Sequence, residues 1–159
     1  MTSIEIGRSK HASRAYSFDD VALVPMKRVR DAADVTLTWK IDAYEFEHPI
    51  MMAPMDSIAS PATVIEYSKL GGLAVLDLEG LWTRLEDPST ALNELASLKG
   101  SVGVKRLQEL YAAPVDADLM RERVSQLRDA GIAVAGALSP QAAAVHHDAV
   151  IKDRKSTRL

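Results

Sequence analysis

Two apolar runs in this sequence are each followed by a serine-proline pair, and this arrangement constrains the fold more than any other feature. The run at 49–53 precedes the pair at 60–61, and the run at 132–138 precedes the pair at 139–140. Serine is a preferred helix N-cap, and the fixed φ of proline suits the first helical residue. Each pair therefore predicts a helix that begins after a buried strand.

The segments around these runs predict further strands and helices in alternation. The first helix should end near Leu70, because the glycines at 71–72 can take the left-handed conformation that closes a helix. Residues 73–76 form another apolar run, and 118–130 has an amphipathic helical pattern that Gly131 ends. This alternation indicates an α/β fold with parallel strands, either an open doubly wound sheet or part of a barrel.

The remaining segments have weaker patterns. Residues 18–25 predict a short capping strand or turn, and 35–41 is apolar at every second position, which predicts a half-buried strand. Residues 44–48 are typical of a connecting loop. We expect a helix over 85–98 and another short strand over 100–105.

Composition and charge narrow the class of protein. The chain has 159 residues, of which 47% are hydrophobic and 26% charged, so one domain with a hydrophobic core is expected. The net charge of −3 argues against nucleic acid or an anionic membrane surface as a partner. No run reaches the roughly 18 apolar residues of a membrane helix, and the N-terminal residues lack the apolar region of a secretory signal. A cytoplasmic location is expected.

Several kinds of site are unlikely on sequence grounds. The sequence contains no cysteine, which excludes disulfides, thiolate metal ligands and cysteine nucleophiles within these residues. Gly100, Gly103 and Lys105 suggest a phosphate loop, but no Gly-Lys-Ser/Thr follows, so a strand with a close backbone approach is preferred. His146 and His147 would point about 100° apart on a helix and cannot chelate one metal from a single face. No metal site is predicted.

Two pairs of acidic residues are candidates for a site. Asp77 and Glu79 follow a buried strand and share one face if the strand continues. The carboxyl ends of parallel strands are where such proteins place their sites. Asp19 and Asp20 lie in the first predicted turn. Each pair either lines a site or consists of ordinary turn acids, and the second interpretation is preferred.

Three motifs resemble the IMP dehydrogenase/GMP reductase family in order and spacing. SFDDVALVP at 17–25 is similar to the family's opening T-F-D-D-V-L-L-V-P, PIMMAPMDSIASP at 49–61 to its first barrel strand and loop, and LGGLAVL at 70–76 to its second strand. The family's usual His-His-Asn is replaced by Asp-Leu-Glu at 77–79, and no CBS pair interrupts the chain. These features resemble the IMP dehydrogenase-related branch of actinobacteria.

The resemblance implies a (β/α)8 TIM barrel with its site at the C-terminal ends of the strands. It implies a tetrameric oxidoreductase of purine (guanine) nucleotide biosynthesis that oxidises IMP to XMP with NAD. In that reaction a cysteine thiolate adds to the purine, hydride passes to NAD and water releases the product. Ala53 and Met55 match the positions that border the ribose and base of IMP, and Asp56 matches the acid that follows. The resemblance places no cofactor-binding residue.

The chain is expected to be an N-terminal fragment of the family domain. Residues 1–150 are interpreted as the first part of the barrel, with strands at Ile50, Leu73 and Ile132, whereas a whole barrel has eight. Residues 151–159 form a basic tail that does not look native to the fold. Because the family's catalytic cysteine has no counterpart here, the fragment is expected to be inactive.

Two alternative functions remain open at this stage. One is a non-catalytic regulatory or binding paralogue that associates with an IMP dehydrogenase. The other is GMP reductase, which runs a related hydride transfer in the opposite redox sense with NADPH. Nothing in the sequence separates oxidation from reduction.

Overall fold

The computed structural model of the chain describes residues 3–24 and 30–151. Its contacts divide the chain into two units, 1–36 and 37–159. No helix in the described ranges is long and apolar enough to cross a membrane. The predicted basic tail falls outside these ranges, apart from Ile151 at the end of the last helix.

The first unit consists of short elements: β1 (Ser3–Gly7), β2 (Lys10–Ser13) and the 3-10 turns η1 (Phe18–Asp20) and η2 (Ala32–Asp34). Strands β1 and β2 pair antiparallel. The segment predicted as a capping strand or turn is a turn, because the Asp20 carboxylate accepts hydrogen bonds from the backbone N–H and the hydroxyl of Ser17, both at 3.0 Å. These bonds, the backbone one above all, lower the pKa of Asp20. Pro25 lies outside the described residues.

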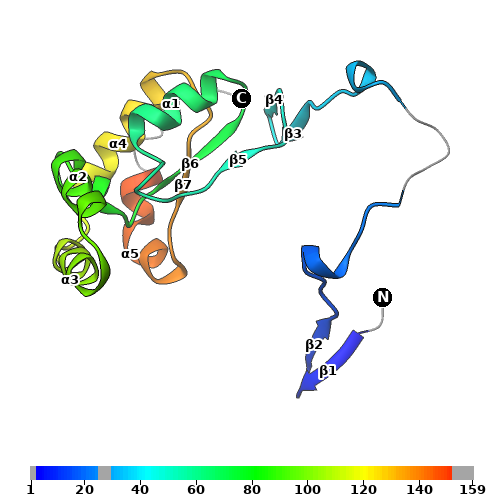
Figure 1. Cartoon of the computed structure of the whole chain (residues 1–159), viewed down its shortest axis with the longest axis horizontal. Helices are drawn as coiled ribbons and strands as arrows, with labels where there is room; N and C mark the ends of the chain where they lie inside the picture. The colour runs from blue at the N-terminus through cyan, green and yellow to red at the C-terminus, as the bar shows by residue number, and fades with distance from the viewer. Residues whose placement is uncertain (1–2, 25–29, 152–159) are drawn as a thin grey trace. The chain divides into compact units, whose positions relative to one another are not determined.

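The second unit begins with an antiparallel hairpin and continues as alternating strands and helices (Figure 1). Its elements are β3 (Trp39–Ile41), β4 (Tyr44–Phe46), β5 (Met51–Met52), α1 (Pro61–Lys69), β6 (Leu73–Asp77), η3 (Leu81–Thr83), α2 (Ser89–Ser97), α3 (Gly100–Tyr111), α4 (Ala117–Asp129), β7 (Ala135–Ala137) and α5 (Pro140–Ile151). Strands β5, β6 and β7 form a parallel sheet in that order. The three predicted barrel strands are therefore confirmed, although β5 and β7 are shorter than expected.

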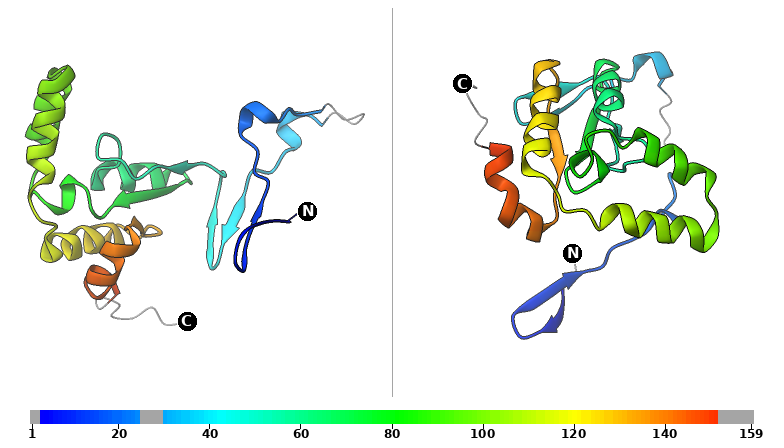
Figure 2. Two further views of the ribbon diagram at one scale, coloured as in Figure 1. Left: turned by 90° about the horizontal axis from the view of Figure 1, so that it is seen from below. Right: turned by 90° about the vertical axis from the view of Figure 1, so that its left-hand side faces the viewer.

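One hydrophobic core joins this sheet to helices α1, α4 and α5. Alternate residues of β6, Ala74 and Leu76, are fully buried in it, together with Val64 of α1 and Met120 of α4. Val75, whose side chain lies on the other face of the strand, is only partly buried. Figure 2 shows α4 and α5 side by side, with α2 and α3 standing apart from them. Consecutive parallel strands with helices packed on one face are the architecture of a partial barrel, as predicted.

The helix caps follow the sequence prediction closely. The Ser60 hydroxyl accepts a hydrogen bond from the Thr63 N–H at 3.1 Å, and the Ser139 hydroxyl accepts one from Ala142 at 3.2 Å. Gly71 and Gly131 take positive φ values of 85° and 70° directly after α1 and α4. Four sequence signals thus fix the ends of three helices.

Two expectations for the weaker segments are wrong, and a third is confirmed only in part. Residues 44–48 contain strand β4, because Asp42 adopts a φ of 52° and turns the chain back so that Tyr44 pairs with Ile41. The strand expected over 35–41 is limited to Trp39–Ile41. Residues 100–105 begin helix α3, which buries Leu110 near its other end.

One backbone hydrogen bond joins the two ends of the segment that connects η3 to α4. The Asp116 N–H donates to the Thr83 carbonyl at 2.8 Å, and the α2–α3 hairpin lies between these two residues. Helix α2 buries no residue and α3 only Leu110. The hairpin is therefore attached to the sheet mainly at its base.

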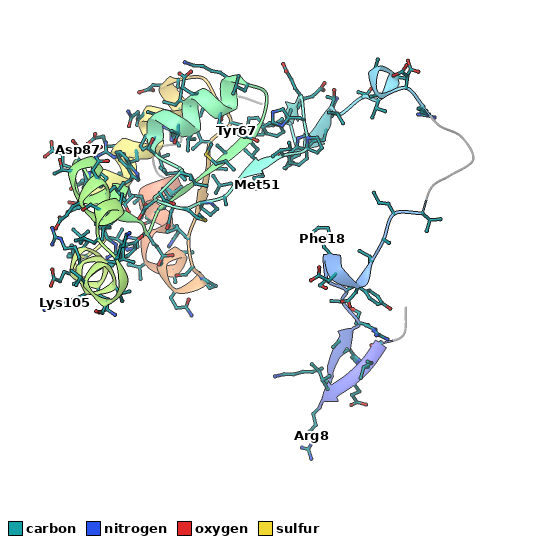
Figure 3. All side chains as sticks on the ribbon, viewed as in Figure 1. Arg8, Phe18, Met51, Tyr67, Asp87 and Lys105 are labelled. Carbon is teal, nitrogen blue, oxygen red and sulfur yellow. The ribbon has the colours of Figure 1, made fainter. Side chains whose placement is uncertain are left out.

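Substitution of Gly72 tests the packing of α1 against the sheet. A Cβ at Gly72 would lie 2.4 Å from the Tyr67 ring, whose hydroxyl donates to the Ile50 carbonyl at 3.2 Å; Figure 3 shows Tyr67 and Met51 on these neighbouring segments. We expect Gly72→Ala to lower the free energy of unfolding by about 2 kcal/mol in urea titrations, because the rigid ring must shift.

The matched control is Gly103→Ala. Gly103 lies in α3, and its Cβ would meet only ordinary contacts, with Leu98 at 3.5 Å and beyond, so the same change should stabilise the chain by up to about 1 kcal/mol. Equal effects of the two substitutions would contradict the packing described for α1.

Candidate functional site

A cavity of about 670 Å³ lies at the C-terminal ends of β5 and β6, where the α2–α3 hairpin covers the sheet edge. Its lining residues come from the loop after β5, the end of β6, η3 and the hairpin: Pro54, Met55, Asp56, Ser57, Asp77, Leu81, Leu92, Asn93, Leu95, Ala96, Leu107 and Tyr111. This is the end of a parallel sheet at which barrel proteins bind their ligands.

The loop after β5 is a tight turn that places two of the three predicted site residues at the cavity. The Met55 N–H donates to the Ala53 carbonyl at 3.0 Å, and the Ala59 N–H donates to the Met55 carbonyl at 2.8 Å. Met55 and Asp56 line the cavity. Ala53 is exposed and is not among the lining residues.

The Asp56 carboxylate joins three separate segments. Its Oδ2 accepts hydrogen bonds from the Leu81 N–H at 2.7 Å and from the Tyr111 hydroxyl. Its Oδ1 is buried and has no hydrogen-bond partner in the described part of the chain. Gly80 lies so close that a Cβ there would be 2.2 Å from Oδ1. Asp56 thus acts as a latch that joins the loop after β5 to η3 and α3, and its Oδ1 remains an acceptor without a donor among the described residues.

Arg84 also bonds to the backbone on both sides of this latch, before η3 and at the end of α3. Its Nε donates to the Glu79 carbonyl at 2.9 Å, and its Nη1 donates to the carbonyls of Tyr111, at 3.1 Å, and Ala113. The guanidinium also lies 5.4 Å from the centre of the Tyr111 ring. Burial, and then the bond to Asp56, raise the pKa of Tyr111, so its hydroxyl stays a donor at neutral pH.

Asp77 and Glu79 separate instead of sharing a face. The strand ends at Asp77, whose Oδ1 accepts the Glu79 N–H at 2.9 Å, and Asp77 lines the cavity. The Glu79 carboxylate turns to Ser139 and accepts hydrogen bonds from its N–H and, at 3.0 Å, its hydroxyl. Burial raises the pKa of Asp77; the charges of Asp56 and Glu79 add to this, and the Glu79 N–H and Arg84 oppose it. The site-lining interpretation fits Asp77, and Glu79 supports the start of α5.

The other sequence candidates lie elsewhere. Gly100, Gly103 and Lys105 are part of helix α3, and Lys105 points outward from it (Figure 3). His146 and His147 are on α5, where the His147 Nδ1 lies 3.2 Å from the Ala143 carbonyl. In residues 3–24 and 30–151, no three His, Cys, Asp or Glu side chains come together as a metal site would require.

Sequence reasoning missed Tyr111, Arg84 and Leu81. Tyr111 reaches Asp56 across 55 positions of the chain, and no local pattern encodes a contact of that range. The sequence offered one signal, the turn DLEG at 77–80, because Leu81 and Arg84 come shortly after it.

Comparison with known proteins now identifies the family. The family model described as the IMP dehydrogenase / GMP reductase domain matches residues 15–157. The chain belongs to this family. Uncharacterized oxidoreductases of Mycolicibacterium smegmatis and Mycobacterium tuberculosis are each 39% identical to it over 143 residues, which is 87% of this chain and 38% of each relative.

A solved structure extends the match to three dimensions. An IMP dehydrogenase/GMP reductase-like protein from Corynebacterium glutamicum superposes with a TM-score of 0.81 and 43% identity, covering 94% of this chain and 42% of that one. An inosine-5'-monophosphate dehydrogenase of Korarchaeum cryptofilum is 34% identical over 62 residues, 39% of this chain and 13% of that protein. The predicted family and its actinobacterial branch are confirmed. The chain spans well under half the length of these relatives.

Removal of the Tyr111 hydroxyl tests the latch in this family member. In Tyr111→Phe the α2–α3 hairpin loses its bond to a carboxylate, so its amide hydrogens should exchange about tenfold faster. Hydrogen-exchange mass spectrometry measures this directly. Tyr67→Phe removes a comparable hydroxyl bond, to the Ile50 carbonyl, and should leave exchange in the hairpin unchanged. Unaltered exchange in Tyr111→Phe would show that the hairpin is held by other contacts.

Asp77→Asn tests the electrostatics of the cavity through stability. The raised pKa of Asp77 means that folding favours its protonated form, so the wild-type chain loses stability as pH rises from the ordinary aspartate value through the folded pKa. Asparagine keeps the acceptor for the Glu79 N–H without the charge. We expect the urea midpoint of the variant to exceed that of the wild type above this range and to converge with it at acid pH. A gap that widens toward acid pH contradicts the assignment.

Proposed function

We propose that this chain supplies the substrate-facing first part of an IMP dehydrogenase-related oxidoreductase, which oxidises IMP to XMP with NAD in guanine nucleotide synthesis. The observation that supports this most is the position of Met55 and Asp56. In a member of the IMP dehydrogenase / GMP reductase family, both line a cavity at the carboxyl ends of parallel strands.

The cavity suits the ribose and base of a purine nucleotide. Leucines at 92, 95 and 107 give it apolar walls of the kind on which a flat ring packs. Asp56 and Asp77 supply acceptors for hydroxyl or amino hydrogens. We propose that Ala53 completes the site from the exposed end of the loop.

The chemical step needs groups that these residues do not contain. The family reaction uses a cysteine thiolate, and no cysteine occurs among the 159 residues. The described residues also do not fit the diphosphate of NAD, because the glycines at 100 and 103 lie in a helix and the guanidinium of Arg84 is bonded to backbone carbonyls. We derive no step through the cofactor from this chain.

The chain's own residues can bind and orient the substrate. We propose that the hydride transfer takes place in a longer protein. In that protein we also propose the tetrameric assembly and cytoplasmic location that the family resemblance implies. Residues 1–150 would then be the first part of one barrel domain.

A kinetic comparison tests this proposal. The chain of residues 1–159 should form no NADH from IMP and NAD, whereas a protein extended to the length of its relatives should do so. In the extended protein, Met55→Ala should raise the KM for IMP about tenfold through lost contact with the base. Met51→Ala, the same change outside the cavity lining, should leave KM within about twofold, since it removes no substrate contact.

Three outcomes would overturn the proposal. NADH formation by residues 1–159 would show that the chemistry needs no cysteine. Conversion of GMP to IMP with NADPH by the extended protein would assign it as a GMP reductase. If the extended protein catalyses neither reaction but changes the activity of an IMP dehydrogenase mixed with it, the extended protein would be assigned as a regulatory paralogue.

A further inference from the structure

The residues that line the cavity carry a net negative charge. Of its twelve residues, Asp56 and Asp77 are acidic and none is lysine, arginine or histidine. The charges interact, since Asp56 contributes to the raised pKa of Asp77. A ligand group that enters here therefore meets acceptors and a negative potential.

Nearby arginines offset this charge only in part, because Arg84 opposes the rise in the pKa of Asp77 without cancelling it. The Arg84 guanidinium donates to the carbonyls of Glu79, Tyr111 and Ala113, which orients it along the backbone. On the hairpin, Arg106 forms an ion pair with Glu94 at 3.0 Å. No basic side chain among the lining residues is left to receive a phosphate or carboxylate.

Acceptor atoms in the cavity lack donors. Asp56 Oδ1 is buried without a hydrogen-bond partner in the described ranges, and a buried acceptor in that state costs free energy. The Glu79 N–H occupies only Oδ1 of Asp77. Because Asp56 Oδ1 is fully buried and packed against Gly80, the acceptor left for a ligand's hydroxyl or amino hydrogen is the second oxygen of Asp77.

From these observations we infer that the cavity selects its ligand by charge. It binds the ring end of a ligand that bears hydroxyl or amino donors, and it excludes an anionic group. Asp77 is the specificity-determining residue. The inference rests on the proposed function only for placing a purine nucleoside here. In that case the ribose and base enter the cavity and the 5'-phosphate stays outside it.

A matched series of indoles tests the charge selection without any purine. Tryptophol, tryptamine and indole-3-acetate share one ring and differ in a hydroxyl, an ammonium and a carboxylate. The chain is labelled at its methionine methyl groups, of which Met55 reports on the cavity and Met120, fully buried in the core, reports on global changes. Ligand titrations are followed by NMR.

We expect tryptophol and tryptamine to shift the Met55 signal, and indole-3-acetate to need a concentration at least about tenfold higher, because like charges repel in a partly desolvated site. Asp77→Asn should bring indole-3-acetate to within about threefold of tryptophol. Asp129→Asn makes the same change outside the cavity lining and should preserve the wild-type ratio.

Equal binding of indole-3-acetate and tryptophol to the wild type would overturn the inference, as would an unchanged ratio in Asp77→Asn or no shift of Met55 by any probe. Titration with inosine and IMP separates this result from the proposed function. Charge selection among the indoles without any binding of inosine would leave the inference standing and remove the purine site.

Discussion

The second unit depends on the burial of one face of a three-stranded parallel sheet. Ala74 and Leu76 of β6 share one hydrophobic cluster with Val64, Met120 and Leu127 from two helices. Because the helices use the sheet's outer face, the ends of the strands remain free to carry polar side chains. The core thus determines where a site can form, and it leaves the chemistry of that site to the loops.

At those strand ends, the Asp56 carboxylate holds several segments of the chain together. Asp56 holds a backbone N–H of η3 and the hydroxyl of Tyr111, and Arg84 aligns the carbonyls behind them. Asp56 also lines the cavity, and its Oδ1 is buried without a hydrogen-bond partner among the described residues. One side chain therefore combines structural support with a place in the cavity lining, so variants of Asp56 disturb both and are less informative about the cavity than variants of Asp77.

The fold was more predictable from sequence than the site. Serine-proline pairs and closing glycines act through local backbone geometry, so both ends of α1, the end of α4 and the start of α5 could be read from a few neighbouring residues. Hairpin β3–β4 was missed because it depends on a left-handed Asp42, a conformation that aspartate adopts only occasionally. Helix α3 was missed because its valines also suit a strand. At the site, Met55 and Asp56 were found from a motif, whereas Tyr111 was not, because its role comes from a contact across 55 positions of the chain.

The meeting of the Thr83 carbonyl and the Asp116 N–H has a consequence for how such proteins diversify. A segment whose two ends are already joined can be lengthened, shortened or exchanged with little change in the entropy of closing the loop. Variation in the length or sequence of the α2–α3 hairpin is therefore compatible with an unchanged sheet. The hairpin also forms one wall of the cavity, so such variation would reshape that wall while β6, which ends at Asp77, and the loop that carries Asp56 stay in place.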